Sequence, residues 1–130
     1  MTMKEIKDKM LEKSMVWAVY GATPDTHKFG YKILDKMKKN GYEVYGVNPK
    51  YHEIDGDKVY ENLNMIPKKV DCIDVVVNPK IAMSVIDEAL AEGISYIWFQ
   101  PGTHNEEVIK KAVDKGLNVV YDHCVYAILK

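Results

Sequence analysis

The chain has 130 residues, 47% of them hydrophobic, and its 18 basic and 19 acidic residues leave a net charge of −1. This length corresponds to a single domain, and the balanced charge argues against nucleic acid as a partner. No segment approaches the roughly 18 apolar residues of a membrane-spanning helix, and the charged N-terminus is unlike a secretion signal, so no membrane partner is expected.

The first elements are read from apolar spacing. Residues 2–13 carry apolar side chains at helical intervals among Lys and Glu. We therefore assign residues 1–14 to an N-terminal helix packed on the domain, and residues 15–130 to the domain itself. Residues 15–20 form an almost continuous apolar run, which is typical of a parallel strand buried on both faces. A helix over residues 31–39 follows and ends at an Asn-Gly pair.

The middle of the chain continues the alternation of strands and helices. A second strand is predicted over residues 43–47, and a loop over residues 48–57 because that segment is rich in turn-forming residues. A short helical turn near residues 61–65 precedes a third strand over residues 70–77. The next helix begins at Asn78-Pro79, since Asn favours the N-cap and Pro the first turn.

The rest of the chain adds two helices, each followed by a strand. The helices are predicted over residues 80–92 and 105–115, and the strands over residues 95–99 and 117–121. Five strands alternating with helices predict an α/β fold, namely a Rossmann-like, doubly wound, parallel five-stranded sheet in one domain. We expect the strand order 3-2-1-4-5, which opens a ligand crevice above the first and fourth strands.

Polar, proline-containing corners follow three of the predicted strands. The four residues Val-Asn-Pro-Lys occur twice, at 47–50 and at 77–80, and a third break is Gln100-Pro101-Gly102. The carboxyl ends of parallel strands lie along one rim, where open α/β sheets bind ligands. We therefore expect function at this rim.

The loop from Gly21 to Gly30 joins the first strand to its helix and favours an anion. Backbone N–H groups and the helix dipole point at this place, Gly21 permits close approach, and the Thr23 hydroxyl can donate a hydrogen bond. The loop matches neither the G-x-G-x-x-G pattern nor a P-loop, so tight dinucleotide binding and nucleoside-triphosphate hydrolysis are not indicated. The alternative interpretation is an ordinary strand–helix connection.

The corner after the second strand indicates the kind of ligand. An NAD site places an acidic side chain there for the ribose hydroxyls, whereas this chain has Asn48, with Lys50 two residues later. All basic residues are lysines, and the ammonium of Lys50 suits a ribose that carries a phosphate, as in coenzyme A (CoA) or NADP. The alternative is a solvated loop lysine.

Several strings in the chain resemble the small stand-alone CoA-binding proteins. They are Val-Asn-Pro-Lys after the second strand, Trp98 with Gln100 and Gly102, Asn-Glu-Glu at 105–107, and Asp-His-Cys at 122–124. The resemblance covers about residues 15–125. The chain is also similar to the CoA-binding domain of succinyl-CoA synthetase α subunits and of ADP-forming acyl-CoA synthetases.

This resemblance implies binding of coenzyme A or acyl-CoA as the cofactor, with the phosphates at the first loop, the adenosine at the second-strand corner and the pantetheine arm beside the fourth strand. The cofactor-binding residues that it implies are Gly21, Ala22, Thr23, His27, Lys28, Asn48, Pro49, Lys50, Asn78, Pro79, Gln100 and Gly102. Members of the family usually carry an Arg in the first loop. This chain offers only His27 and Lys28 there, so its pyrophosphate contacts are expected to be weaker or differently arranged.

Residues for catalysis are few. The histidines show no metal-ligand spacing and lie in separate predicted loops, at His27, His52, His104 and His123, so no metal site is assigned. Cys72 and Cys124 indicate a reduced, cytoplasmic protein. Cys124 has two interpretations, a small buried hydrophobe or a thiol that forms a mixed disulfide with CoA.

We therefore expect a binding protein without enzymatic activity. The phosphotransfer histidine of succinyl-CoA synthetases lies in a second domain, outside the region of resemblance, so their ligase activity is not expected. The alternative function is an NADP-linked or nucleotide-sensing regulator that uses the same crevice. Whether the chain forms a homo-oligomer or binds a protein partner stays open.

Overall fold

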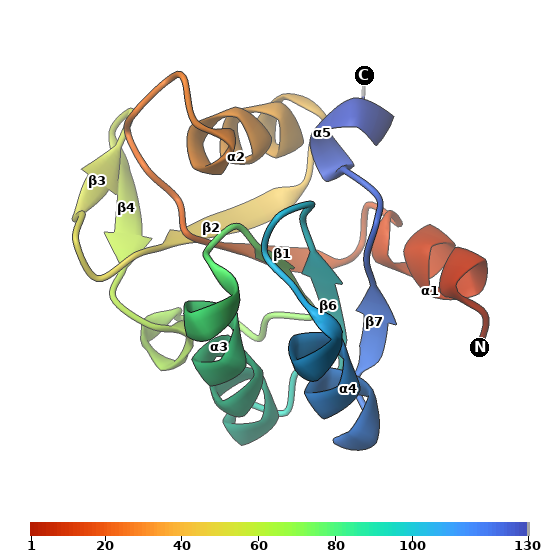
Figure 1. Cartoon of the computed structure of the whole chain (residues 1–130). Coiled ribbons are helices and arrows are strands. Elements are labelled where there is room, and N and C mark those ends of the chain that lie inside the picture. The colour runs from red at the N-terminus through yellow and green to blue at the C-terminus, as the bar shows by residue number, and fades with distance from the viewer. Residues whose placement is uncertain (130) are drawn as a thin grey trace.

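A seven-stranded sheet separates two layers of helices in this protein (Figure 1). The structure is a computed structural model and describes residues 1–129. The strands are β1 (Val16–Tyr20), β2 (Glu43–Val47), β3 (Glu53–Ile54), β4 (Asp57–Tyr60), β5 (Cys72–Val75), β6 (Tyr96–Phe99) and β7 (Asn118–Val120). Their order is β3-β4-β2-β1-β5-β6-β7, and every neighbouring pair is parallel except β3 and β4.

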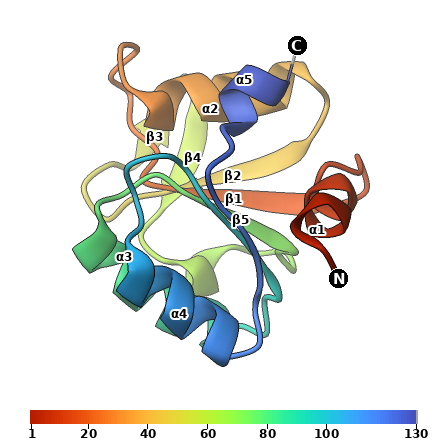
Figure 2. The same ribbon diagram turned by 45° about the vertical axis from the view of Figure 1, so that its right-hand side comes forward.

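The helices cover both faces of this sheet. They are α1 (Met3–Met10), α2 (Phe29–Lys39), α3 (Pro79–Ala91), α4 (Glu106–Asp114) and α5 (Val125–Ile128), with a 3-10 turn η1 (Leu63–Met65). Figure 2 shows α2 and α5 side by side on one face, with α3 and α4 on the other. The helix α1 packs near β7. None of the described helices has the length and apolar character needed to cross a membrane.

The apolar residues of the strands form two cores, one on each face of the sheet. All five residues of β1 are buried, as expected for a central parallel strand. On the α2 side Trp17 and Trp98 lie with their ring centroids 6.2 Å apart. On the α3 and α4 side Ile73 and Ile97 belong to the second core.

The structure confirms the single-domain, Rossmann-like α/β class but corrects the sheet. The prediction of five strands in the order 3-2-1-4-5 is wrong, because the third predicted strand is β5 and pairs with β1 on the side away from β2. The strands β2 to β4 therefore lie on one side of β1, and the strands β5 to β7 lie on the other. The order in which the chain adds strands reverses between β1 and β5. The expected crevice above the first and fourth strands moves to this position.

The second correction concerns residues 48–57, predicted as a loop. Part of this segment forms β3 and the start of β4, which make a two-residue hairpin at Asp55-Gly56. Both residues have positive φ, 50° and 85°, which is the conformation that a tight hairpin turn of the Asp-Gly type requires. The helix α5 after the last strand was also not predicted, whereas β1, β2, β6, α2, α3 and α4 lie within two residues of their predicted bounds.

Candidate functional site

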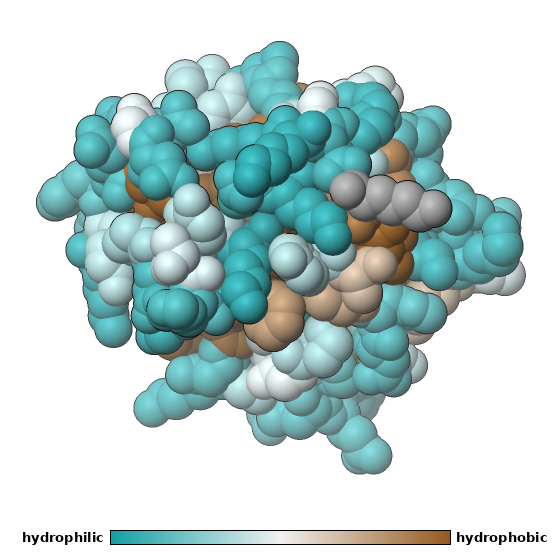
Figure 3. All heavy atoms as spheres, turned by 90° about the horizontal axis from the view of Figure 1, so that it is seen from above, coloured by the Kyte–Doolittle hydropathy of each residue, from teal (hydrophilic) through white to brown (hydrophobic). Residues whose placement is uncertain are grey.

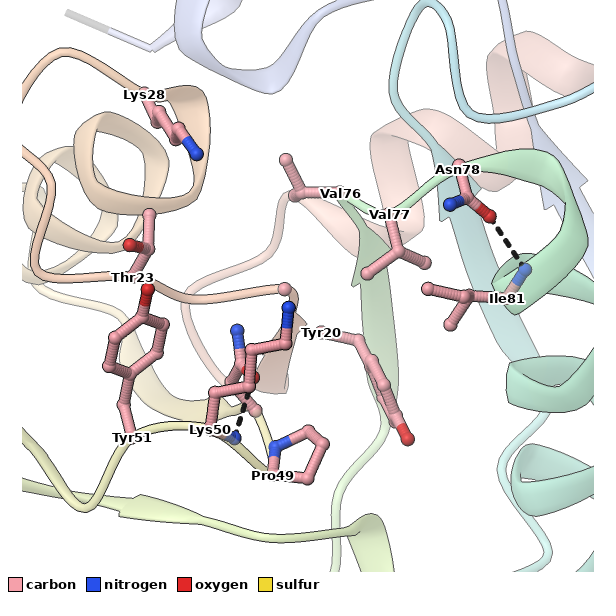
Figure 4. A pocket seen from close by; sticks show the side chains of 12 residues that line it. Tyr20, Thr23, Lys28, Pro49, Lys50, Tyr51, Val76, Val77, Asn78 and Ile81 are labelled. Atoms are coloured by element: carbon pink, nitrogen blue, oxygen red, sulfur yellow. Dashed lines mark hydrogen bonds between the residues drawn. The ribbon is translucent and has the colours of Figure 1, made fainter.

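A pocket of about 430 Å³ opens at the carboxyl ends of β2, β1 and β5 (Figure 4). Such a volume is within the roughly 300–1,000 Å³ range of small-molecule sites. The pocket is situated where the chain reverses across the sheet, which is the usual ligand position in open α/β folds. Its lining residues are Tyr20, Gly21, Thr23, Lys28, Asn48, Pro49, Lys50, Tyr51, Val76, Val77, Asn78 and Ile81.

The start of α2 lies beside this pocket, where its N-cap residue Lys28 is one of the lining residues. Thr2, Asn78 and Asn105 cap α1, α3 and α4 with side-chain hydrogen bonds, whereas Lys28 at the start of α2 makes none. The first N–H groups of a helix have no partner within the helix, and together with the helix dipole they attract an anion. The uncapped start of α2 therefore favours a negatively charged group beside Lys28.

Two glycines let this helix start approach the end of β1. A Cβ on Gly30 would lie 2.2 Å from the carbonyl oxygen of Gly21, and a Cβ on Gly21 would lie 2.5 Å from the carbonyl oxygen of Val76. Gly21 also has a φ of 109°, which side-chain-bearing residues rarely adopt. Any larger residue at either position would push α2 and the strand ends apart and change the shape of the pocket.

Asn48 shapes the corner after β2. Its Nδ2 donates to the carbonyl of Ala22 over 3.0 Å, and its Oδ1 accepts from the backbone N–H of Lys50 over 2.9 Å. The side chain thereby ties the β2 corner to the first loop. It holds Lys50 and Tyr51 on the pocket side, where Figure 4 shows Tyr51 reaching toward Thr23.

The electrostatic character of the pocket is positive. Among residues 1–129, the charged side chains that line it are those of Lys28 and Lys50, both exposed, and none of the lining residues is a carboxylate. The Thr23 hydroxyl is buried and accepts a hydrogen bond from the backbone N–H of Asp25 over 3.2 Å, which leaves its own proton for donation. The lysine ammonium groups, this hydroxyl and the start of α2 together form a wall whose charge favours an anion.

The opposite wall is largely apolar and comes from β1, the end of β5 and α3. Val76, Val77 and Ile81 face the pocket in Figure 4, together with the ring of Tyr20. The Tyr20 hydroxyl donates to the Glu88 carboxylate over 2.5 Å, away from the ligand space. Burial and this carboxylate raise the pKa of the Tyr20 hydroxyl, so it stays protonated at neutral pH.

Asn78 adds a polar group beside the apolar wall, next to Ile81 (Figure 4). Its Oδ1 accepts from the backbone N–H of Ile81 over 2.9 Å, as predicted for the N-cap of α3, and the same residue lines the pocket. The capping bond occupies the carbonyl end of the amide, so Nδ2 is the group left to face a ligand.

The structure brings seven of the twelve predicted site residues into this pocket, namely Gly21, Thr23, Lys28, Asn48, Pro49, Lys50 and Asn78. It does not bring the other five into the lining. Ala22 is fully buried, His27 is exposed on the loop, and Pro79 is the first residue of α3. Gly102 lies exposed in the turn after β6, where its φ is 87°.

Gln100 is the fifth of these residues and has a structural role. It is 3% exposed, its Nε2 donates to Cys124 Sγ over 3.2 Å, and its Oε1 accepts from the backbone N–H of Val125 over 3.1 Å. The polar corner after β6 therefore anchors the start of α5.

Sequence reasoning missed five lining residues, which are Tyr20, Tyr51, Val76, Val77 and Ile81. The valines look like ordinary strand residues in the sequence, yet β5 ends at Val75 and they line the crevice. Their position depends on where the strand stops, which the apolar run from Val75 to Val77 does not reveal.

Other hollows in the described part of the chain carry weaker chemical signals. The largest, of about 610 Å³, is an open surface hollow along α4 lined by residues such as His104, Ile109 and Val113. It is formed largely by one helix, with no convergence of strand ends. Within residues 1–129 no three His, Cys, Asp or Glu side chains are grouped so that they could hold a metal ion.

The face that carries α2 and α5 is seen from above in Figure 3 and is mostly hydrophilic, with smaller hydrophobic areas between. The helix α2 has five lysines and one aspartate when its N-cap is included, and of these residues Lys28 lines the pocket.

Comparison with known proteins identifies the family of this chain. Residues 15–130 match the model of a family described as the CoA binding domain. The chain is 28% identical over 120 residues to an ADP-forming acetate–CoA ligase I of Archaeoglobus fulgidus, covering 85% of this chain and 18% of that protein. It is 29% identical over 119 residues to the α subunit of an ADP-forming acetate–CoA ligase II of Pyrococcus furiosus, covering 83% and 26%.

These two curated relatives are much longer proteins, since the chain spans about a fifth to a quarter of their length. A solved structure of similar size is a hypothetical protein from Pyrococcus horikoshii OT3, with a TM-score of 0.88 and 33% identity over 98% of this chain and 89% of that one. The match of the family model over residues 15–130 decides the classification, and the chain belongs to the CoA binding domain family.

Proposed function

We propose that this protein binds coenzyme A or an acyl-CoA in the crevice above β2, β1 and β5 and catalyses no reaction. The observation that carries the proposal is the pocket at the strand ends, which combines an uncapped helix start with two lysines and no carboxylate. Its relatives include CoA ligases, and its family is described as CoA-binding.

The parts of CoA fit different parts of this pocket. The pyrophosphate would lie at the start of α2, where Lys28 and Thr23 offer donors. The adenosine would lie at the corner after β2, with its ring against Pro49 and Tyr51 and its ribose phosphate near Lys50. The pantetheine arm would then run past Val76 toward β6.

The absence of intrinsic catalysis is part of this proposal. No histidine or cysteine is among the lining residues, and the two free ammonium groups and the Thr23 hydroxyl have no general base beside them in the pocket. We also place the protein in the cytoplasm, because both cysteines are free thiols and a reducing compartment keeps them so.

Replacement of Lys50 by alanine tests the proposal. If the ammonium contacts the ribose phosphate, Lys50→Ala should weaken CoA binding by roughly tenfold, about 1.4 kcal/mol. The affinity for dephospho-CoA, which lacks this phosphate, should change little. Isothermal titration of both ligands measures the difference. As a matched control, Lys115→Ala removes the same charge from the exposed end of α4, remote from the pocket, and should change neither affinity.

The same titrations distinguish the alternative function. NADP also carries a ribose phosphate, so Lys50 by itself suits both ligands. Wild-type protein that prefers NADP over CoA would replace our proposal with an NADP-linked or nucleotide-sensing role. If Lys50→Ala lowers the affinities for CoA and dephospho-CoA equally, Lys50 does not contact the ribose phosphate.

A further inference from the structure

Cys124 is the second notable group near the rim, and it lies outside the pocket described above. It is half-buried at the start of α5, and its Sγ accepts a hydrogen bond of 3.2 Å from Gln100 Nε2. The Gln100 amide is itself held in place by the N–H of Val125. A fixed N–H donor directed at sulfur stabilises the negative charge of a thiolate, the reactive form of cysteine.

A second observation at this place is the carboxyl group of Asp74. It is fully buried in β5, and neither of its oxygens has a hydrogen-bond partner among the described residues. Asp74 alternates with Cys72 and Val76 along the chain, so its side chain lies on the sheet face that carries α2 and α5. Among the described residues, Cys124 is the titratable group whose charge affects the pKa of Asp74. Native proteins rarely leave a buried carboxyl without a partner unless the group has a use.

Burial raises the pKa of Asp74 well above its usual range, so the group is a neutral carboxylic acid at neutral pH. A neutral acid has a proton to donate and adds no negative charge beside the sulfur. The Cys124 sulfur therefore has a fixed hydrogen-bond donor in Gln100 and an uncharged group in Asp74.

The position of Cys124 along the rim connects it with the proposed ligand. The pocket ends at Val76 and Val77 after β5, and the next strands in the sheet are β6, followed by Gln100, and β7, followed by the segment that carries Cys124. Neighbouring strands are about 4.8 Å apart, so β7 is roughly 10 Å from β5. A CoA molecule with its phosphates at the start of α2 would extend its pantetheine arm from β5 toward β7, where Cys124 lies.

We propose that Cys124 captures the sulfur of CoA as a mixed disulfide, with Gln100 positioning its sulfur through the hydrogen bond from Nε2 and Asp74 as an uncharged neighbour. This inference rests on the proposed function, because the pocket must deliver the ligand. The oxidant is a CoA disulfide. The Cys124 thiolate attacks one of its sulfurs, a new S–S bond joins protein and CoA, the old S–S bond breaks, and the released CoA thiolate takes up the proton lost by Cys124.

The test is intact-protein mass spectrometry of the reduced full chain after incubation with CoA disulfide. We expect one CoA adduct, located on Cys124 by peptide mapping and removed by dithiothreitol. Cys124→Ser should lose the adduct. Cys72→Ser should keep it, because Cys72 is fully buried and burial raises the pKa of its thiol, which leaves it unreactive.

Two further arms separate a guided reaction from a generic reactive thiol. Glutathione disulfide should react at least about tenfold more slowly than CoA disulfide, a difference of about 1.4 kcal/mol in activation free energy, because glutathione has no adenosine or phosphates to bind the pocket. Desulfo-CoA, which fills the pocket but has no sulfur, should slow the reaction with CoA disulfide. Equal rates for the two disulfides would overturn the inference.

Calorimetry with reduced CoA keeps the two proposals distinguishable. If CoA binds but no adduct forms, the mixed disulfide is wrong and the binding function stands. If CoA does not bind, the proposed function is wrong, and any adduct then reflects an exposed thiol.

Discussion

Asp74 makes the stability of this protein depend on pH in an unusual direction. Most carboxylates are stabilised in their charged form by folding, whereas burial raises the pKa of Asp74 well above the usual value of about 3.9. In the folded state the group therefore keeps a proton that the unfolded chain releases. Its contribution to stability is complete below the unfolded pKa and is lost as the pH rises through the folded pKa.

Asp74→Asn should remove this dependence, because the amide does not titrate. Between about pH 4 and the folded pKa, the wild type should lose up to about 1.4 kcal/mol of unfolding free energy per pH unit relative to the variant. Urea unfolding at a series of pH values measures the difference. The control Asp114→Asn alters an exposed ion pair with Lys110 and should show almost no such slope. Parallel pH profiles for wild type and Asp74→Asn would contradict a buried, protonated Asp74.

At the scale of elements, the contact between β1 and α2 depends on the missing side chain of Gly30. Alanine inside a helix is normally more stable than glycine by about 1 kcal/mol. Here the added Cβ would lie 2.2 Å from the Gly21 carbonyl oxygen, which is backbone and cannot rotate away. Gly30→Ala should therefore lower stability by roughly 1–3 kcal/mol, the usual cost of overpacking.

A loss of stability in Gly30→Ala would support the close contact between α2 and the end of β1. Thermal unfolding gives the stability, and CoA titration of the same variant should show weaker binding because the start of α2 has moved. Lys39→Ala, in the exposed last turn of the same helix, should cost no more than the roughly 0.5 kcal/mol of its ion pair with Asp35. A stabilised Gly30→Ala would show that α2 can shift freely from β1.

Elements with strong local signals are predictable from the sequence of this protein. The cap at Asn78 and the apolar run of β1 determine their local structure, and both predictions are confirmed. The hairpin at Asp55-Gly56 also has a local signal, but its strands are so short that the turn formers around them suggest a loop. The helix α5 has four residues and is held by Gln100 and α2, so its sequence carries little information about it.

At the scale of the whole molecule, strand order was the part that the sequence could not determine. The orders 3-2-1-4-5 and 2-1-3-4-5 contain the same strands, helices and right-handed crossovers, and both bury every strand. The choice depends on which side of β1 accepts β5, and that is a matter of packing between distant segments. Because both orders keep all carboxyl ends at one rim, seven of twelve predicted site residues still meet in one pocket.

The helix α1 lies outside the family match, which begins at residue 15, yet it is built into the core. Met10 is fully buried against the α2-side core, and its carbonyl accepts a hydrogen bond from Trp17 Nε1 over 3.2 Å. The Tyr42 hydroxyl donates to the carbonyl of Leu11 over 2.6 Å. The side chains of β1 and the end of α2 therefore depend on α1 for part of their burial.

Met10→Ala should lower the unfolding free energy by about 2–5 kcal/mol, the range for truncating a buried Met. Met65→Ala is the matched control, since Met65 is 56% exposed, and should change stability by no more than about 0.5 kcal/mol. Urea unfolding measures both. CoA affinity of folded Met10→Ala should equal that of the wild type, because no residue of α1 lines the pocket. If Met10→Ala were as stable as Met65→Ala, the domain would fold without help from α1. A large loss of unfolding free energy in Met10→Ala means that α1 folds cooperatively with the domain.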